Sequence, residues 1–196
     1  MAVVSIKNKL RRGNLLVGND AYDPGGMVPI ATTVVGSGGA ANVEFTSIPS
    51  TYTHLQIRVL ARSDRSAGVD IVSLRMNNDT GGNYADHLLY GDGSSAQTDR
   101  NTSASKINIQ RLASDNLSAS IFSGFVIDIL DYANTNKYKT IRYLGGFDAN
   151  GSGRIGLGSG LWQSTSTITS LKFQGLEFSS NYKEFTTFAL YGIKSA

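Results

Sequence analysis

The run from Asp148 to Ile155 is the part of this 196-residue chain that most resembles a chemical site. Oxygen-bearing side chains stand at its first, third and fifth positions (Asp148, Asn150 and Ser152), and a glycine stands at the sixth. This spacing matches the first half of a calcium-binding loop. The twelfth position is Ser159 instead of a bidentate glutamate, so a calcium ion would lose two oxygen ligands and a charge. The sequence therefore favours a glycine-rich hairpin turn and leaves a calcium site as the alternative.

Glycines occupy positions 151, 153, 156, 158 and 160, a density that superficially resembles a phosphate-binding loop. No Gly-Lys-Ser/Thr follows them and no helix is expected there, so a phosphate would find no helix N-terminus to hold it. Glycine at alternate strand positions instead lets a backbone or a bulky ring approach closely. We expect Trp162 to supply that ring.

Asp128 and Asp131 are the two carboxylates that lie closest together in an apolar, strand-like run. A spacing of three places them on opposite faces of a strand, so they cannot form an acid–base pair by themselves. We expect a structural role for them, such as accepting hydrogen bonds from Arg142 or Lys139.

The remaining candidates are two histidines and nine tyrosines. His54 and His87 belong to neither a Gly-x-Ser-x-Gly nor a His-Glu-x-x-His motif, and we expect both at the surface. Several tyrosines flank polar loops, where rings can stack on sugars or anchor a protein interface, although rings that cover sheet edges explain them equally well. We therefore expect no catalytic residue, metal ligand or cofactor, and a protein that is not an enzyme.

The composition is that of a weakly charged structural protein. Charged residues make up 17% of the chain, against roughly 25% in typical soluble domains. The absence of cysteine excludes disulfides, thiolate metal sites and cysteine nucleophiles. We expect no transmembrane helix, no membrane partner and no secretory signal. The net charge of +3 leaves most of the chain nearly neutral, which argues against a specific nucleic-acid partner.

Residues 1–29 are expected to form an extended arm. Val3, Ile6 and Leu10 could share one face of a short helix, but glycines and an Asp-Pro-Gly-Gly run break any regular structure after it. The arm combines a basic cluster with short apolar segments, and such a segment often docks on a neighbouring protein; the alternative is a frayed terminus. The expected docking residues are Ile6, Lys7, Lys9, Leu10, Arg11, Arg12, Leu15, Leu16 and Val17.

From residue 30 onward, alternating apolar and polar residues separated by turn signals predict β-strands. The expected strands are 30–35, 42–46, 54–63, 70–77, 85–91, 106–112, 121–132, 138–147, 155–162, 168–174 and 185–193. Residues 92–105 are expected to form a long polar loop, and 121–132 to form a central strand that pairs with 138–147 as a hairpin. This pattern predicts an all-β domain over residues 30–196, a two-sheet antiparallel sandwich of jelly-roll type.

Three segments of the chain resemble virion proteins of tailed bacteriophages: Phe45–Arg58, Val126–Tyr132 and Phe188–Ile193. The similarity covers roughly residues 30–194, excludes the arm and marks no catalytic residue. It implies a jelly-roll-like domain that assembles as a homotrimer in the virion, after synthesis in the host cytoplasm.

Three functions are compatible with these features. The first is a capsid decoration (cement) protein that docks on the major capsid protein, or on other virion proteins, through its arm. The second is a tail fibre or receptor-binding tip that presents residues 77–84 and 92–104 to a host surface glycan. The third is a glycan-degrading hydrolase, which would need two carboxylates from different strands in one cleft.

Overall fold

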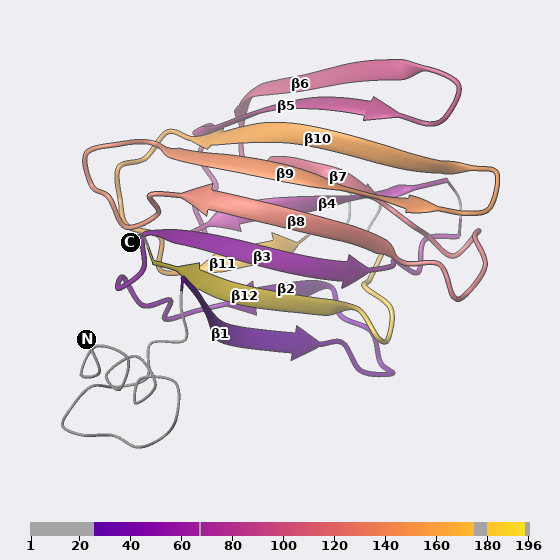
Figure 1. The fold of residues 1–196 in the computed structure, drawn as a ribbon, viewed down its shortest axis with the longest axis horizontal. Helices are drawn as coiled ribbons and strands as arrows, with labels where there is room; N and C mark the ends of the chain where they lie inside the picture. The colour runs from indigo at the N-terminus through magenta and orange to yellow at the C-terminus, as the bar shows by residue number, and fades with distance from the viewer. Residues whose placement is uncertain (1–25, 67, 175–179, 195–196) are drawn as a thin grey trace, which may run out of the picture.

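The computed structural model describes residues 26–66, 68–174 and 180–194, which form twelve β-strands and no helix (Figure 1). The strands are β1 (Met27–Val34), β2 (Asn42–Phe45), β3 (His54–Ala61), β4 (Asp70–Met76), β5 (Tyr84–Gly91), β6 (Ala96–Ala104), β7 (Ile107–Leu112), β8 (Ser123–Leu130), β9 (Lys139–Asp148), β10 (Gly153–Trp162), β11 (Leu171–Gln174) and β12 (Thr187–Ile193). The prediction of an all-β fold is confirmed.

The strands form two antiparallel sheets that pack face to face. The large sheet has eight strands in the order β1-β12-β3-β8-β9-β10-β5-β6, and the small sheet has four in the order β2-β11-β4-β7. In Figure 1 the large sheet lies in front of the small sheet. The predicted two-sheet antiparallel sandwich is therefore confirmed.

Four nested strand pairs relate the two sheets to each other. β1 pairs with β12, β2 with β11, β3 with β8 and β4 with β7. These pairs form one long antiparallel ribbon whose strand pairs alternate between the two layers. We interpret this connectivity as a jelly roll, in which such a ribbon wraps around one core.

Two inserted hairpins widen the large sheet beyond this core. The β5–β6 hairpin lies between β4 and β7 in the chain, and the β9–β10 hairpin lies between β8 and β11. Together they add the strands β9, β10, β5 and β6 to one side of β8. The prediction of a polar loop over residues 92–105 is wrong, because β6 occupies 96–104 and only a short turn precedes it. β8 is an interior strand that pairs with β9, as predicted.

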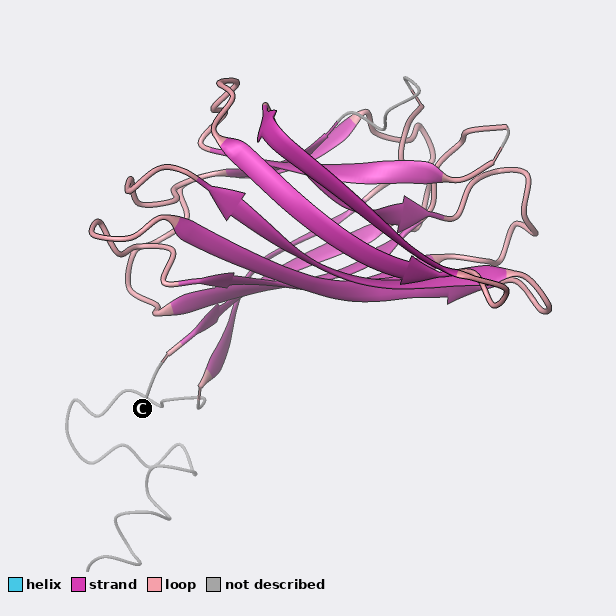
Figure 2. Cartoon of the chain, turned by 90° about the horizontal axis from the view of Figure 1, so that it is seen from above, coloured by secondary structure: helices cyan, strands magenta, loops and turns pink. Residues whose placement is uncertain are grey.

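The core lies where the two sheets face each other. Strand β3 shows its basis, since Leu55, Ile57 and Val59 are buried at alternate positions. Rings join the layers: Phe188 of the large sheet lies 4.8 Å, centroid to centroid, from Phe173 of the small sheet. Successive strands of the large sheet are visibly rotated relative to one another (Figure 2), so its outer face is twisted rather than flat.

The first described strand begins slightly before the predicted domain. β1 starts at Met27, so residues 27–29 of the expected arm belong to an edge strand of the large sheet. Gly26 accepts a hydrogen bond from the backbone amide of Lys194 (2.9 Å), which ties the start of β1 to the end of β12.

Candidate protein-binding face

Aliphatic side chains form a continuous row across the outer face of the large sheet. The row consists of Leu89 on β5, Leu157 on β10, Leu144 on β9 and Val126 on β8. Leu157 is in register with Leu89 on one side and with Leu144 on the other. Leu144 is in turn in register with Val126. Because opposed side chains on one sheet face have Cβ atoms about 4.5–5.5 Å apart, these four form one apolar strip, the aliphatic row.

The apolar surface extends beyond this row. Six aliphatic residues of the outer face are 39–65% exposed, and we call them the aliphatic face: Leu60, Leu89, Val126, Leu144, Ile155 and Leu157. Ile155, the most exposed at 65%, lies two residues before Leu157 on the same strand and therefore on the same side. Single exposed leucines are ordinary, whereas contiguous apolar patches mark sites of interaction.

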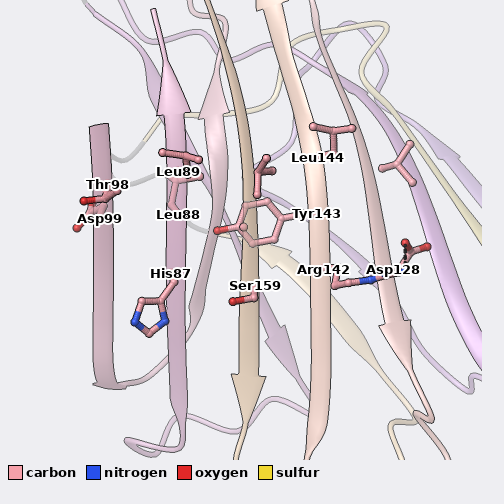
Figure 3. Close-up of a pocket in the computed structure, with 13 residues that line it drawn as sticks. His87, Leu88, Leu89, Thr98, Asp99, Asp128, Arg142, Tyr143, Leu144 and Ser159 are labelled. Atoms are coloured by element: carbon pink, nitrogen blue, oxygen red, sulfur yellow. Dashed lines mark hydrogen bonds and ion pairs between the residues drawn. The ribbon is translucent and has the colours of Figure 1, made fainter. Parts of the chain in front are cut away.

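A polar row runs parallel to the aliphatic row, two residues further along each of the same strands (Figure 3). It consists of His87, Ser159, Arg142 and Asp128, in the order β5, β10, β9 and β8. Arg142 Nη2 donates to Asp128 Oδ2 (3.4 Å), as the sequence predicted. Asp128 Oδ1 also accepts a hydrogen bond from Gln56 Nε2 on β3 (3.0 Å).

The two rows border a shallow hollow of about 830 Å³ on the outer face. Leucines and Val126 make most of its surface apolar. Its one tyrosine, Tyr143, is only 4% exposed, and its hydroxyl donates to the backbone oxygen of Asn108 on β7 (3.0 Å). The hollow therefore lacks an accessible Phe, Tyr or Trp ring on which a sugar could stack, and its aliphatic surface suits another protein better.

The alternating glycines of β10 explain why the aliphatic side chains of this strand face outward. A Cβ atom on Gly158 would lie within 3.0 Å of the Tyr143 ring, and one on Gly160 would lie 2.7 Å from Cδ1 of Ile107 on the small sheet. The inner face of β10 is thus filled by neighbouring strands, as we expected of glycine. The expectation that Trp162 supplies the ring is wrong, because Trp162 stacks on Tyr84 (6.3 Å between centroids).

Asp131 and His54 form a separate cluster at one end of β3 and β8. His54 Nδ1 accepts a hydrogen bond from the backbone amide of Asp131 (3.0 Å). Asp131 Oδ2 accepts one from Lys137 (2.6 Å), and this contact holds the pKa of Asp131 below its usual value. Lys139, which we predicted as a partner of these carboxylates, instead donates to three backbone carbonyls. The described geometry gives Asp131 a structural role in this turn.

The run resembling a calcium loop forms the turn between β9 and β10. Ala149 donates to the carbonyl of Ser152 (2.7 Å), and Asp148 Oδ1 accepts a hydrogen bond from the amide of Asn150 (2.7 Å). Asn150 and Gly151 both have positive φ (56° and 106°), as two-residue hairpin turns require. The favoured prediction of a glycine-rich hairpin turn is confirmed.

Four charged residues are buried although the sequence did not predict it: Arg62, Asp70, Asp86 and Lys139. Asp86 on β5 is 3% exposed, and it accepts hydrogen bonds from Asn101 Nδ2 (2.9 Å) and from the amide of Asn108 (3.1 Å). Desolvation raises the pKa of Asp86. Arg62 and Lys139 are 1% and 0% exposed, and each donates to three backbone carbonyls. No sequence signal marks them, because strand charges normally face solvent.

The predicted docking residues of the arm, from Ile6 to Val17, lie outside the described residues. Within the described ranges, no group of three or more His, Cys, Asp or Glu side chains could hold a metal ion. The same ranges contain no helix that could span a membrane.

The exposed aliphatic face is the feature of this structure that most clearly indicates binding. The sequence signal for it was present, since Ile155 and Leu157 alternate with glycines, but the alternation alone does not say which set faces inward. Comparison with protein-family models, curated protein sequences and solved structures found no match to this chain.

Proposed function

We propose that this chain is a non-enzymatic structural protein of a bacteriophage virion, a capsid decoration (cement) protein that associates with copies of itself on the particle surface. The observation that carries the proposal is the aliphatic face, whose chemistry fits burial against protein. The resemblance of three of its segments to tailed-phage virion proteins supports the same assignment.

The aliphatic face is large enough to contribute substantially to an interface. Complete burial of one Leu, Ile or Val side chain is worth about 1.5–3 kcal/mol, and these six side chains are about half exposed. Burying the remainder would therefore contribute roughly 6 kcal/mol in total. Association itself costs about 4–15 kcal/mol, so the aliphatic face meets the lower part of that cost and the surrounding polar rows must supply the rest.

A receptor-binding tip is less well supported than a decoration protein. Residues 77–84 and 92–104 were expected to present tyrosine-rich and Ser/Asn-rich loops to a host surface glycan. Most of the second segment is instead the edge strand β6, which pairs with β5 so that Ala104 lies opposite Tyr84. The ring of Tyr84 is buried and therefore not accessible for stacking on a sugar.

Attachment to the particle is assigned to the arm. Its docking residues, from Ile6 to Val17, precede Gly26 and β1, which is an edge strand of the large sheet. A segment joined at a sheet edge can bind a neighbouring protein without interrupting any strand pair of the sandwich. The four basic residues Lys7, Lys9, Arg11 and Arg12 make this contact sensitive to salt, as for other exposed charges.

The proposal is tested with purified particles of the phage whose genome encodes the chain, prepared without it. Added full-length protein should sediment with the particles at a fixed copy number. Protein lacking residues 2–25 should keep its fold and stay in the supernatant. As a matched control, a four-residue neutral substitution of Lys7, Lys9, Arg11 and Arg12 should bind more weakly, with less dependence on salt.

The outcomes separate the two parts of the proposal. Equal binding of full-length and truncated protein would refute the docking role of the arm. Absence of the full-length protein from native particles, measured by mass spectrometry, would refute the virion assignment itself.

A further inference from the structure

We infer that the aliphatic face binds the same face of a second copy of this chain, about a two-fold axis that runs parallel to the strands between β9 and β10. The chain would then form a dimer in place of the homotrimer that its resemblance to phage virion proteins implies. The inference deepens the proposed function and rests on it, because it names the partner and the symmetry of the self-association. The order β5-β10-β9-β8 has its midpoint at this axis, so the rotation exchanges β10 with β9 and β5 with β8.

The aliphatic row is complementary to itself under this rotation. Leu157 of one copy faces Leu144 of the second copy, because both lie in the same row on exchanged strands. Leu89 faces Val126 of the second copy for the same reason. Each apolar side chain thus meets an apolar side chain, and each contact occurs twice, as an isologous interface requires.

The polar row is also complementary to itself. Arg142 faces Ser159 of the second copy, and His87 faces Asp128 of the second copy. No like charges oppose each other, and each hydrogen-bonding group meets another. A two-fold axis parallel to the rows would instead place Arg142 against the backbone of Gly146, where the Arg142–Asp128 pair would lose water without gaining a partner.

Side-chain size follows the same symmetry. Ile155, the most exposed aliphatic residue of the face, lies opposite Gly146 of the second copy, which has no side chain. Further toward the other end of the strands, Leu161 lies opposite Thr140. Large residues therefore face small or apolar ones on both sides of the aliphatic row.

The twist of the sheet permits this contact. A twisted sheet is saddle-shaped, and rotation by half a turn about an axis parallel to its strands maps a saddle onto itself. Two copies can therefore pack at the uniform spacing of about 10 Å found between stacked sheets. The hollow extends across the axis, from β5 to β8, so it faces the hollow of the second copy.

The available area matches a stable dimer. The contact would be six strands wide, from β6 to β3, with about 4.8 Å between neighbouring strands, and eight residues long at about 3.3 Å per residue. These dimensions give a footprint of roughly 750 Å² per copy. A standard interface buries about 800 Å² on each partner.

The first experiment measures the mass of the full chain in solution by sedimentation equilibrium. Wild-type protein should behave as a dimer, twice the 20.9 kDa chain. Leu144→Glu should weaken the dimer by about 100-fold or more, since it places an unpaired charge in two symmetric apolar contacts. Val34→Glu, at an exposed aliphatic residue on the distant edge strand β1, is the matched control and should leave the dimer intact. A monomer, a trimer, or a dimer unaffected by Leu144→Glu would overturn the inference.

A second experiment tests the direction of the axis. The chain contains no cysteine, so Ser159→Cys and Ile155→Cys each introduce a single thiol. With a bis-maleimide about 10 Å long, each variant alone should cross-link to itself, because the rotation keeps residues at the same level along the strands. A mixture should form no link between position 155 and position 159. A preferred link between the two positions would overturn the inference.

These results are independent of the virion assignment. A dimer absent from phage particles would leave the inference standing and refute the proposed function. A monomer found in particles would overturn the inference and leave the virion assignment standing.

Discussion

Gly158→Ala should destabilise the protein by about 2–3 kcal/mol although it adds one methyl group. The new Cβ would overlap the ring of Tyr143, whose hydroxyl links the large sheet to the small sheet through Asn108. Overpacking of this kind costs about 1–3 kcal/mol. Moving the ring away would also break a hydrogen bond worth about 1 kcal/mol. Against this, alanine reduces the entropy of the unfolded chain and recovers about 0.4–1 kcal/mol.

The assay is urea unfolding followed by fluorescence of Trp162, the single tryptophan. Gly124→Ala is the matched control, because its Cβ would have no atom within 4 Å, and it should be neutral or slightly stabilising. In a double-mutant cycle, Tyr143→Leu should remove most of the cost of Gly158→Ala. Equal stability of the two alanine variants would refute the packing of Tyr143 against Gly158.

Three further predictions concern polar side chains that hold loops through hydrogen bonds: Asp79, Lys139 and Arg62. Hydrogen bonds to Asp79, most of all the one from Trp162, hold the pKa of its carboxyl below the ordinary value of 3.8. Their contribution to stability is therefore complete above about pH 4 and is lost as the pH falls through the lowered pKa. The stability difference between wild type and Asp79→Ala should therefore shrink in acid, and a constant difference from pH 5 to 2 would contradict this. Lys139→Met should cost at least about 3 kcal/mol in urea unfolding, because three carbonyls lose their buried donor; a loss under 1 kcal/mol would refute that role. Arg62→Met should accelerate amide hydrogen exchange in the loop of residues 114–121, because the Arg62 guanidinium donates to three backbone carbonyls of this loop. Unchanged exchange in the loop would show that Arg62 does not hold it in place.

The alternation of apolar and polar residues predicted most of the strands, because one face of each of these strands is buried. In β3, residues Leu55, Ile57 and Val59 face the core while Arg58 and Leu60 face solvent, so the period of two is visible in the sequence. Strand β6 was missed because it is an edge strand exposed on both faces. Its sequence, from Ala96 to Ala104, therefore carries no apolar period and resembles a loop.

The binding face could not be predicted because it depends on which side of β10 is filled from within. Ile155 and Leu157 alternate with glycines, and ordinary patterning would place the aliphatic residues inside. The structure reverses this, since Tyr143 and Ile107 occupy the inner side and leave room only for glycine. That information comes from pairing between distant strands, which a local pattern does not contain.

The central claim, that the aliphatic face is buried between protein copies, is tested most directly by the reactivity of a thiol placed within it. Leu157→Cys and the control Val34→Cys would each carry the only cysteine of the chain. We predict that maleimide labels both at similar rates in dilute solution, and that only position 157 becomes protected as protein concentration rises. Equal labelling of the two positions at every concentration would contradict the account.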